Sequence, residues 1–362
     1  MQLSLSSILV SLATVGSVVA DGPGDAETVV AAITALNTFY NTTTGLWGNE
    51  TTPWWHSAVS LRVLAEYMLT TGSKNYVDQA AYVVDNNRAP LNWWPEGNGD
   101  FRADSTDDTG WWALALVDLY QVTGNETYLD IAEEDEAYMY SFWNTTTCNG
   151  GLIWAVPTLT YHNAISNELY LELTATLHNV IPGDTYYLEH AMEEWKWFNA
   201  SGMINSQWLV NDGLTEDSAC TNNGQTVWTY NQGVLIAGLV QLAKATSDTT
   251  YLDIAQNIAD AVVNSDTLSP GGILTEAGCA SEADCEPNGT SFKGTFIRGL
   301  AKLNAALGGD MYTAYINNNA QSLYDNARQS STDYYGFAWQ GPFDGQETGK
   351  QASAVNLLMS TL

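Results

Sequence analysis

The chain has 362 residues and carries 41 acidic against 11 basic side chains, which gives a net charge of −30 at pH 7. A surface of this charge repels nucleic acids, anionic lipids and acidic polysaccharides at ordinary salt. A neutral partner is therefore expected, although acidity that serves only solubility would look the same.

The first segment, residues 1–20, has no charged side chain, is rich in Leu and Val, and ends in small residues at Val18 and Ala20. This composition predicts a secretory signal peptide that is cleaved near Ala20. It departs from the usual signal in having no Lys or Arg near its start. No later segment reaches the length of about 18 apolar residues that a membrane span requires. We therefore expect a soluble protein that is secreted or associated with a cell wall.

A diverged repeat of amphipathic helices follows along the chain. In the copy that begins at Thr250, Leu252 and Ala259 fall on one helical face while Asp253 falls on the other. The copies begin at Asn75, Thr127, Tyr186, Thr250 and, more faintly, Met311, about 50 to 65 residues apart. Together with Glu27–Tyr40, they predict six half-buried outer helices.

Between these copies lie segments that are apolar almost all round, as in a helix buried on every side. Six such helices are predicted, over Ser57–Leu69, Thr109–Gln121, Ala164–Leu177, Gln232–Ala245, Phe292–Leu307 and Ala352–Leu362. Because the two kinds of helix alternate strictly and no low-complexity linker divides them, we expect an all-α fold. It should be a single domain over residues 21–362, an (α/α)6 barrel of six inner and six outer helices. The run Gly150–Tyr161 should form a rim loop or a short hairpin.

The segments that precede the inner helices should line a common pocket, because in such a ring the inner helices point one end toward it. These segments are rich in aromatic, amide and carboxyl groups, for example TTPWWHS, STDDTGWW and VWTYNQG. Stacking on aromatic rings and hydrogen bonds from amide groups are what a site for a neutral sugar needs.

Two adjacent acids, Asp107 and Asp108, stand at the start of the second inner helix. Aspartate is common at helix starts because its carboxylate accepts free backbone N–H groups and meets the positive end of the helix dipole. Capping is the simpler explanation of such a pair, but one cap does not need two acids and this helix start faces the pocket. Cleavage of a glycosidic bond requires two carboxyl groups. We therefore interpret the pair as the catalytic residues of a glycoside hydrolase.

The roles of the two acids follow from their expected surroundings. Carboxyl groups about 5 Å apart give retention of configuration and about 6.5 to 9.5 Å give inversion, and neighbouring side chains favour the shorter separation. As a helix cap, Asp107 should stay ionised and act as the nucleophile. Asp108, beside that charge and near Trp111, should keep its proton longer and act as general acid and then base. The two roles could also be exchanged.

Five further residues are candidates for contact with the sugar. Asn163 and Tyr230 lie at the starts of the third and fourth inner helices, where a purely structural role is equally compatible with the sequence. Arg298, about a turn inside the fifth inner helix, could anchor a sugar or an Asp carboxylate, or form a structural ion pair. Trp111 and Trp339 adjoin pocket-side loops and could stack on a sugar, although most of the 14 tryptophans should belong to the core.

The four cysteines suit two disulfides in an oxidising compartment. Of the three possible connectivities we favour Cys148 with Cys220, and Cys279 with Cys285 across a short acidic loop. Six N-x-S/T sequons also indicate an exported glycoprotein: Asn41, Asn49, Asn125, Asn144, Asn199 and Asn288. No metal and no cofactor is expected, since the sequence lacks C-x-x-C pairs and its histidines are scattered.

Taken together, these motifs resemble glycoside hydrolase family 76, the endo-α-1,6-mannanases and their relatives in fungal cell walls. The resemblance rests on DDTGWWALA (Asp107–Ala115), YHNAISNELYLELTA (Tyr161–Ala175), WTYNQGVLIAGL (Trp228–Leu239), FKGTFIRGL (Phe292–Leu300) and the closing WQGP and QASAVNLL. It implies an (α/α)6 barrel and a retaining mechanism with Asp107 and Asp108 as the acid pair. It also implies linear α-1,6-mannan as the substrate, and the identity of the sugar comes only from this resemblance.

The expected protein is thus a monomer that hydrolyses neutral mannan or mannooligosaccharides. One alternative is a cell-wall transglycosylase with the same site, in which another sugar takes the place of water. Another is a mannan-binding wall protein without catalysis. Fungal wall members of the family commonly carry a Ser/Thr-rich tail and a segment for a lipid anchor, whereas this sequence stops at LLMSTL. A freely secreted protein and an incomplete sequence are both compatible with this ending.

Overall fold

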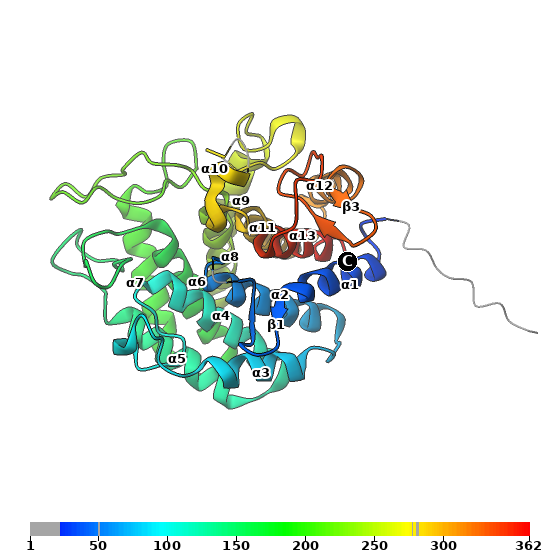
Figure 1. Ribbon diagram of the computed structural model, residues 1–362. Helices are drawn as coiled ribbons and strands as arrows, with labels where there is room; N and C mark the ends of the chain where they lie inside the picture. The colour runs from blue at the N-terminus through cyan, green and yellow to red at the C-terminus, as the bar shows by residue number, and fades with distance from the viewer. Residues whose placement is uncertain (1–21, 50, 277, 280–281) are drawn as a thin grey trace, which may run out of the picture.

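Figure 1 shows a computed structural model of the chain. The structure describes residues 22–362 except positions 50, 277 and 280–281, so the expected signal peptide lies outside the described residues. None of the helices formed by these residues is long and apolar enough to cross a membrane.

The described residues form an (α/α)6 barrel, as the sequence predicts (Figure 1). The inner helices are α2 (Trp55–Thr71), α4 (Thr106–Thr123), α6 (Ala164–Val180), α8 (Thr229–Thr246), α11 (Phe292–Ala306) and α13 (Thr348–Met359). The outer helices are α1 (Ala26–Leu36), α3 (Val77–Asn87), α5 (Glu126–Tyr140), α7 (Tyr186–Ser201), α9 (Thr250–Val263) and α12 (Thr313–Asn326). Each inner helix packs against the next one along the chain, and α13 returns to α2.

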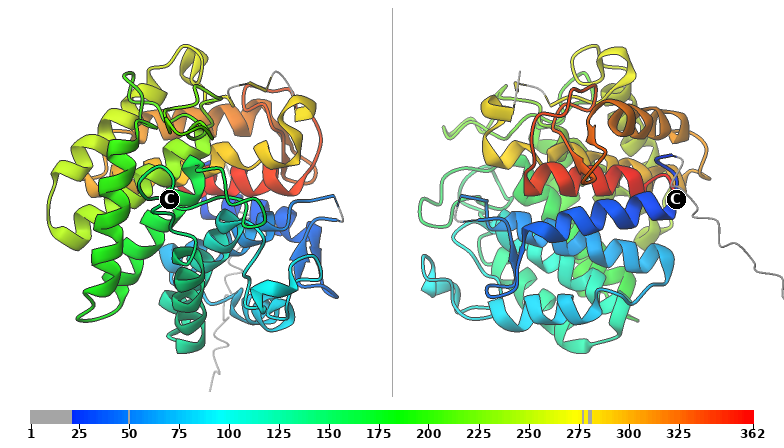
Figure 2. Two further views of the ribbon diagram at one scale, coloured as in Figure 1. Left: turned by 90° about the vertical axis from the view of Figure 1, so that its left-hand side faces the viewer. Right: turned by 45° about the vertical axis from the view of Figure 1, so that its right-hand side comes forward.

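The first and last helices of the barrel, α1 and α13, lie side by side (Figure 2). Smaller elements fill the connections. The short helix α10 (Glu282–Gly289), which the sequence did not predict, precedes α11, and three 3-10 turns are η1 (Asn37–Phe39), η2 (Pro95–Gly97) and η3 (Pro270–Gly272). Strands β1 (Tyr40–Asn41) and β2 (Leu46–Trp47) pair antiparallel, as do β3 (Arg328–Gln329) and β4 (Tyr334–Tyr335). Residues 150–161 form the expected rim loop.

Helices α4 and α8 each begin three residues earlier than predicted, at Thr106 and Thr229. Nothing in these short extensions breaks a helix, and acids are favourable in a first turn because they meet the positive end of the dipole. Asp107, Asp108 and Tyr230 therefore belong to first turns, whose side chains the helix holds in fixed directions. The other end of α4 is set by Gly124, which takes the left-handed conformation that terminates helices.

Charged side chains from four inner helices fill part of the barrel interior. Arg62 on α2 donates from Nε to Asp118 on α4 at 2.8 Å and from Nη2 to Glu172 on α6 at 2.6 Å. Lys302 on α11 lies 3.3 Å from Glu66. Burial alone would raise the pKa of Glu172, but the nearby cations, Arg62 first among them, outweigh burial and lower it. Asp118, the one acid in an otherwise apolar stretch of α4, is thus an ion-pair partner of the barrel interior.

The structure contains both predicted disulfides, Cys148–Cys220 and Cys279–Cys285. The first closes a loop across a sequence separation of 72 residues and ties together two connections at the rim. In the chain-entropy account, closing a loop of this length stabilises the fold by about 4 kcal/mol. The second bonds α10 to the segment before it, directly beside the barrel mouth.

Candidate active site

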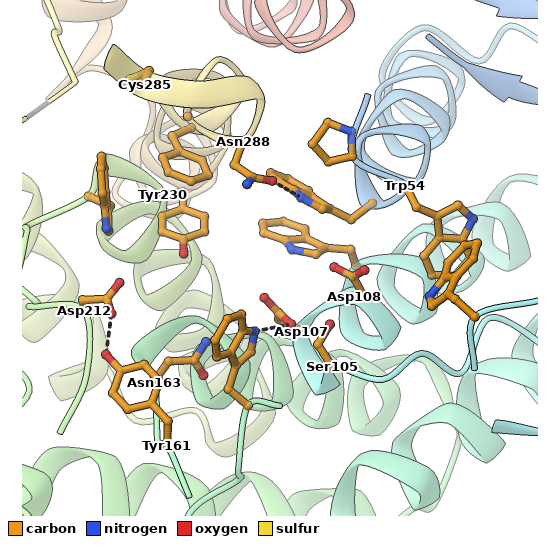
Figure 3. A pocket seen from close by; sticks show the side chains of 18 residues that line it. Trp54, Ser105, Asp107, Asp108, Tyr161, Asn163, Asp212, Tyr230, Cys285 and Asn288 are labelled. Atoms are coloured by element: carbon orange, nitrogen blue, oxygen red, sulfur yellow. Dashed lines mark hydrogen bonds between the residues drawn. The ribbon is translucent and has the colours of Figure 1, made fainter. Parts of the chain in front are cut away.

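A cavity of about 710 Å³ opens at the end of the barrel where the inner helices begin (Figure 3). The helix starts supply Trp55, Asp108, Asn163, Tyr230 and Phe292 to its walls. A second hollow of about 690 Å³ shares Tyr161, Asp212 and Trp228 with the first, so the two lie next to each other. The size suits a ligand larger than a single sugar unit, since small-molecule sites commonly span about 300 to 1,000 Å³.

Asp107 and Asp108 both line this cavity, and Figure 3 shows their side chains pointing into it from the start of α4. The indole Nε1 of Trp154 donates a hydrogen bond to Asp107 Oδ1 at 3.0 Å. The expectation that Asp107 caps the helix is wrong, because Ser105 occupies the N-cap position and Asp107 is the second helical residue. Both acids are therefore available to a ligand.

The two acids differ in how readily they ionise. Burial raises the pKa of Asp107 to about 6, although hydrogen bonds from Ser105, backbone N–H groups and Trp154 act to lower it. Burial raises the pKa of Asp108 well above its usual range, and the charges of Asp107 and Asp104 add to this effect. The sequence suggested that the helix N–H groups would keep the pKa of Asp107 low. In the structure they do not, because burial outweighs them. Of the two, Asp108 holds its proton to higher pH.

Aromatic rings form the wall beside the acids. Trp111 stacks on Trp55 with ring centroids 5.2 Å apart, and Tyr230 stacks on Phe292 at 3.8 Å. Trp111 and Tyr230 are also nearly parallel, with centroids 6.5 Å apart. Burial raises the pKa of Tyr230 well above 10, so its hydroxyl stays protonated and can donate to a ligand. Apolar ring faces next to polar groups match the alternating faces of a sugar.

Three of the five predicted sugar contacts, Trp111, Asn163 and Tyr230, line the cavity. Asn163 is also the N-cap of α6, where its Oδ1 accepts from Ser166 N at 3.3 Å. Both roles that the sequence left open are therefore compatible with its position.

The other two predicted contacts lie elsewhere, which corrects the expectation for them. Arg298 is buried below the cavity, with Nη2 3.6 Å from Glu172 Oε2, and it belongs to the interior ion network. Its guanidinium carbon lies 5.9 Å from the Trp111 ring, so it supports the cavity from behind. Trp339 is 1% exposed, and Lys293 Nζ lies 4.4 Å from its ring centroid. It is a core residue because the loop after β4 folds back over α11.

The sequence did not single out three residues of the site, Trp154, Tyr161 and Asp212. The Tyr161 hydroxyl donates to Asp212, and Asn223 Nδ2 donates to the same hydroxyl at 2.8 Å. All three come from rim loops that carry no periodic pattern. The sequence did offer two signals: Trp154 lies in a segment already expected at the rim, and Tyr161 opens the motif YHNAISNELYLELTA.

The sequence model of glycosyl hydrolase family 76 matches residues 25–362. The chain belongs to glycosyl hydrolase family 76. Among its relatives, a putative mannan endo-1,6-alpha-mannosidase of Schizosaccharomyces pombe is 26% identical, and the match covers 85% of this chain and 73% of that protein. A mannan endo-1,6-alpha-mannosidase of Candida albicans is also 26% identical, with 85% and 72% covered.

The fold agrees with that of solved family 76 structures. One is an alpha-1,6-mannanase of Salegentibacter sp. HEL1_6, matched with a TM-score of 0.81 at 24% identity over 94% of this chain and 98% of the other. It was solved as an inactive variant in which two adjacent aspartates are replaced, in complex with alpha-1,6-mannotetrose. Within the residues that the structure of our chain describes, no group of three or more His, Cys, Asp or Glu is arranged to hold a metal ion.

Proposed function

We propose that the chain is a retaining, endo-acting glycoside hydrolase that cleaves α-1,6-mannosidic linkages in mannan. Asp107 acts as the nucleophile and Asp108 as the general acid and base. The observation that carries the proposal is the pair of adjacent acids in an aromatic-walled cavity, with Asp108 holding its proton to higher pH than Asp107. This difference supplies one carboxylate and one carboxylic acid in the same pH range, as glycoside cleavage by retention requires.

In the first step, the Asp107 carboxylate attacks the anomeric carbon while Asp108 gives its proton to the glycosidic oxygen. The bond to the leaving sugar breaks and a glycosyl ester forms on Asp107. In the second step, Asp108 takes a proton from water as that water attacks the anomeric carbon, which frees Asp107. The hydrogen bond from Trp154 stabilises the negative charge of Asp107 before the attack and after its release.

Three observations support the choice of substrate. The relatives from Schizosaccharomyces pombe and Candida albicans are named as mannan endo-1,6-alpha-mannosidases. Replacement of two adjacent aspartates accompanies inactivity in the Salegentibacter enzyme, which holds an alpha-1,6-linked tetrasaccharide. A second hollow adjoins the cavity at Tyr161 and Asp212, which suits a polymer that extends beyond the acid pair. We also propose export from the cell, because both disulfides suit an oxidising compartment.

The decisive experiment is digestion of α-1,6-mannooligosaccharides with measurement of product lengths over time. Hydrolysis yields only products shorter than the substrate, from internal as well as terminal bonds. Products longer than the substrate would show that a second sugar replaces water, and the enzyme would then be a transglycosylase. The anomeric NMR signal of the first product should be that of α-mannose, and initial β-mannose would exclude retention.

A further inference from the structure

One of the six sequons lies in the wall of the cavity. Asn288, at the end of α10, lines the cavity together with the acid pair. Figure 3 shows its side chain pointing into the cavity, on the wall that faces Asp107. None of the other five sequon asparagines lines this cavity. The position of Asn288 therefore calls for a different explanation from theirs.

The amide group of Asn288 has a fixed orientation. Its Oδ1 accepts a hydrogen bond from Trp55 Nε1 at 3.0 Å. Because an amide is planar, this contact directs the two N–H donors of Nδ2 away from Trp55 and toward the open cavity. Among the hydrogen bonds of the described residues, none uses Asn288 Nδ2. Two donors are therefore left for a ligand.

The backbone around Asn288 is held firmly. Its carbonyl oxygen accepts from Ser291 Oγ at 3.2 Å and lies 3.4 Å from His56 Nε2. Thr290, the third residue of the sequon, is buried and donates from its hydroxyl to Pro287 O at 2.8 Å. A Cβ added at Gly289 would lie 2.8 Å from Cys285 Sγ, so only glycine lets this segment pack against the disulfide. The disulfide and these contacts fix where the amide points.

We infer that Asn288 is a substrate-binding residue that donates to a sugar hydroxyl, and that it carries no glycan in the active protein. A glycan would be joined to the same Nδ2 that faces the cavity, and it would occupy the space between Tyr230 and the acid pair. Asn288 and Asn199 are both exposed, but only Asn288 lines the cavity, so the sequence-based expectation of glycosylation at Asn288 conflicts with a cavity that is open to substrate. The inference rests on the proposed function, since it assumes that the ligand is a sugar.

Two substitutions test the contact. Asn288→Ala removes the whole amide, and Asn288→Leu keeps its approximate volume while removing its polar atoms. Asn199→Ala, which removes a sequon on the exposed side of α7, is the control. We expect kcat/KM for α-1,6-mannotetraose to fall about tenfold in both Asn288 variants, mainly through KM, which corresponds to one hydrogen bond to the substrate. The control should match the parent. Thermal unfolding midpoints near that of the parent would show that both variants fold.

Mass spectrometry of the Asn288 peptide, from protein made in a host that attaches N-glycans, tests the second half of the inference. The expected result is an unmodified asparagine. A glycan at Asn288 on active protein, or Asn288 variants that match Asn199→Ala in kcat/KM, would overturn the inference while the proposed function stands. If the parent protein cleaves no mannooligosaccharide, the proposed function fails instead. Quenching of tryptophan fluorescence by α-1,6-mannotetraose then compares the same variants, and weaker binding in the Asn288 variants alone would support the contact. Equal quenching in all variants would overturn it.

Discussion

The hydrogen bond from Trp154 to Asp107 gives a sharp test of how the site sets the ionisation of its nucleophile. Trp154→Phe keeps the aromatic face and removes only the N–H donor. The donor contacts one oxygen of a carboxyl group whose pKa burial raises to about 6. Hydrogen bonds to charged groups contribute about 1.5 to 3 kcal/mol. Since the Trp154 side chain is 40% exposed, solvent screens the contact and the lower end applies.

A loss of about 1.4 kcal/mol corresponds to one pKa unit or a tenfold change in rate. The bond favours the ionised form of Asp107, so its removal raises the pKa of Asp107. We therefore expect the acid limb of the kcat/KM profile to move about one unit to higher pH in Trp154→Phe. Near pH 6 the variant should cleave about fivefold more slowly, and the difference should approach about tenfold below about pH 5. Initial rates on α-1,6-mannotetraose between pH 4 and 9 measure both effects.

The control is Trp208→Phe, since Trp208 is 43% exposed and lies outside the cavity. If Trp154→Phe and Trp208→Phe have the same acid limb and the same rate, Asp107 is not the group that must ionise. A lower rate at every pH with an unmoved limb would show that Trp154 acts only as a sugar platform.

Three further outcomes follow from the charges of the site and the barrel. Asp104→Asn removes a charge that helps to raise the pKa of Asp108, so the alkaline limb of the kcat/KM profile should move to lower pH. An unmoved limb would mean that another group acts as the acid. Glu194 is fully buried, burial raises its pKa well above the usual range, and the folded state thus holds its proton to higher pH than the unfolded state. As pH rises above about 4.5, the free energy of unfolding of the parent should therefore fall relative to that of Glu194→Gln. The fall is up to about 1.4 kcal/mol for each pH unit and continues until Glu194 ionises in the folded state. Denaturant unfolding at several pH values measures this difference. Arg62→Met removes the shared partner of two buried carboxylates and should lower the free energy of unfolding by about 3 to 5 kcal/mol. Arg88→Met, at an exposed ion pair, should change it by less than about 1 kcal/mol. Equal effects of the two substitutions in urea titrations would contradict the role given to the interior network.

The ring of helices could be predicted because its evidence is local and repeated. Each outer helix shows an apolar stripe such as Leu252 with Ala259, and stretches of the inner helices are apolar almost all round. Their strict alternation leaves few ways to bury both kinds of helix. The acid pair could be predicted for the same reason. A helix start is recognisable in sequence, and the ring directs every inner helix start toward one cavity. The helix boundaries were less certain, because Asp107 fits a first helical turn as well as a cap.

The remaining residues of the site depend on contacts that no local pattern records. Trp154 reaches Asp107 because its rim loop, which Cys148–Cys220 ties to another connection, forms part of the cavity wall. Arg298 looked like a candidate for sugar binding since free cations are rare in this chain. Its partner Glu172 is supplied by another inner helix, however, so only the closed ring reveals that Arg298 is an interior residue.

The central claim is that Asp107 and Asp108 perform the cleavage, and steady-state kinetics of single substitutions test it most directly. Asp107→Asn and Asp108→Asn should each lower kcat on α-1,6-mannotetraose by at least about 1,000-fold while sugar binding is largely kept. Asp130→Asn, at an exposed acid on α5, should cleave like the parent. If both cavity variants cleave like the parent and like Asp130→Asn, the adjacent acids are not the catalytic pair.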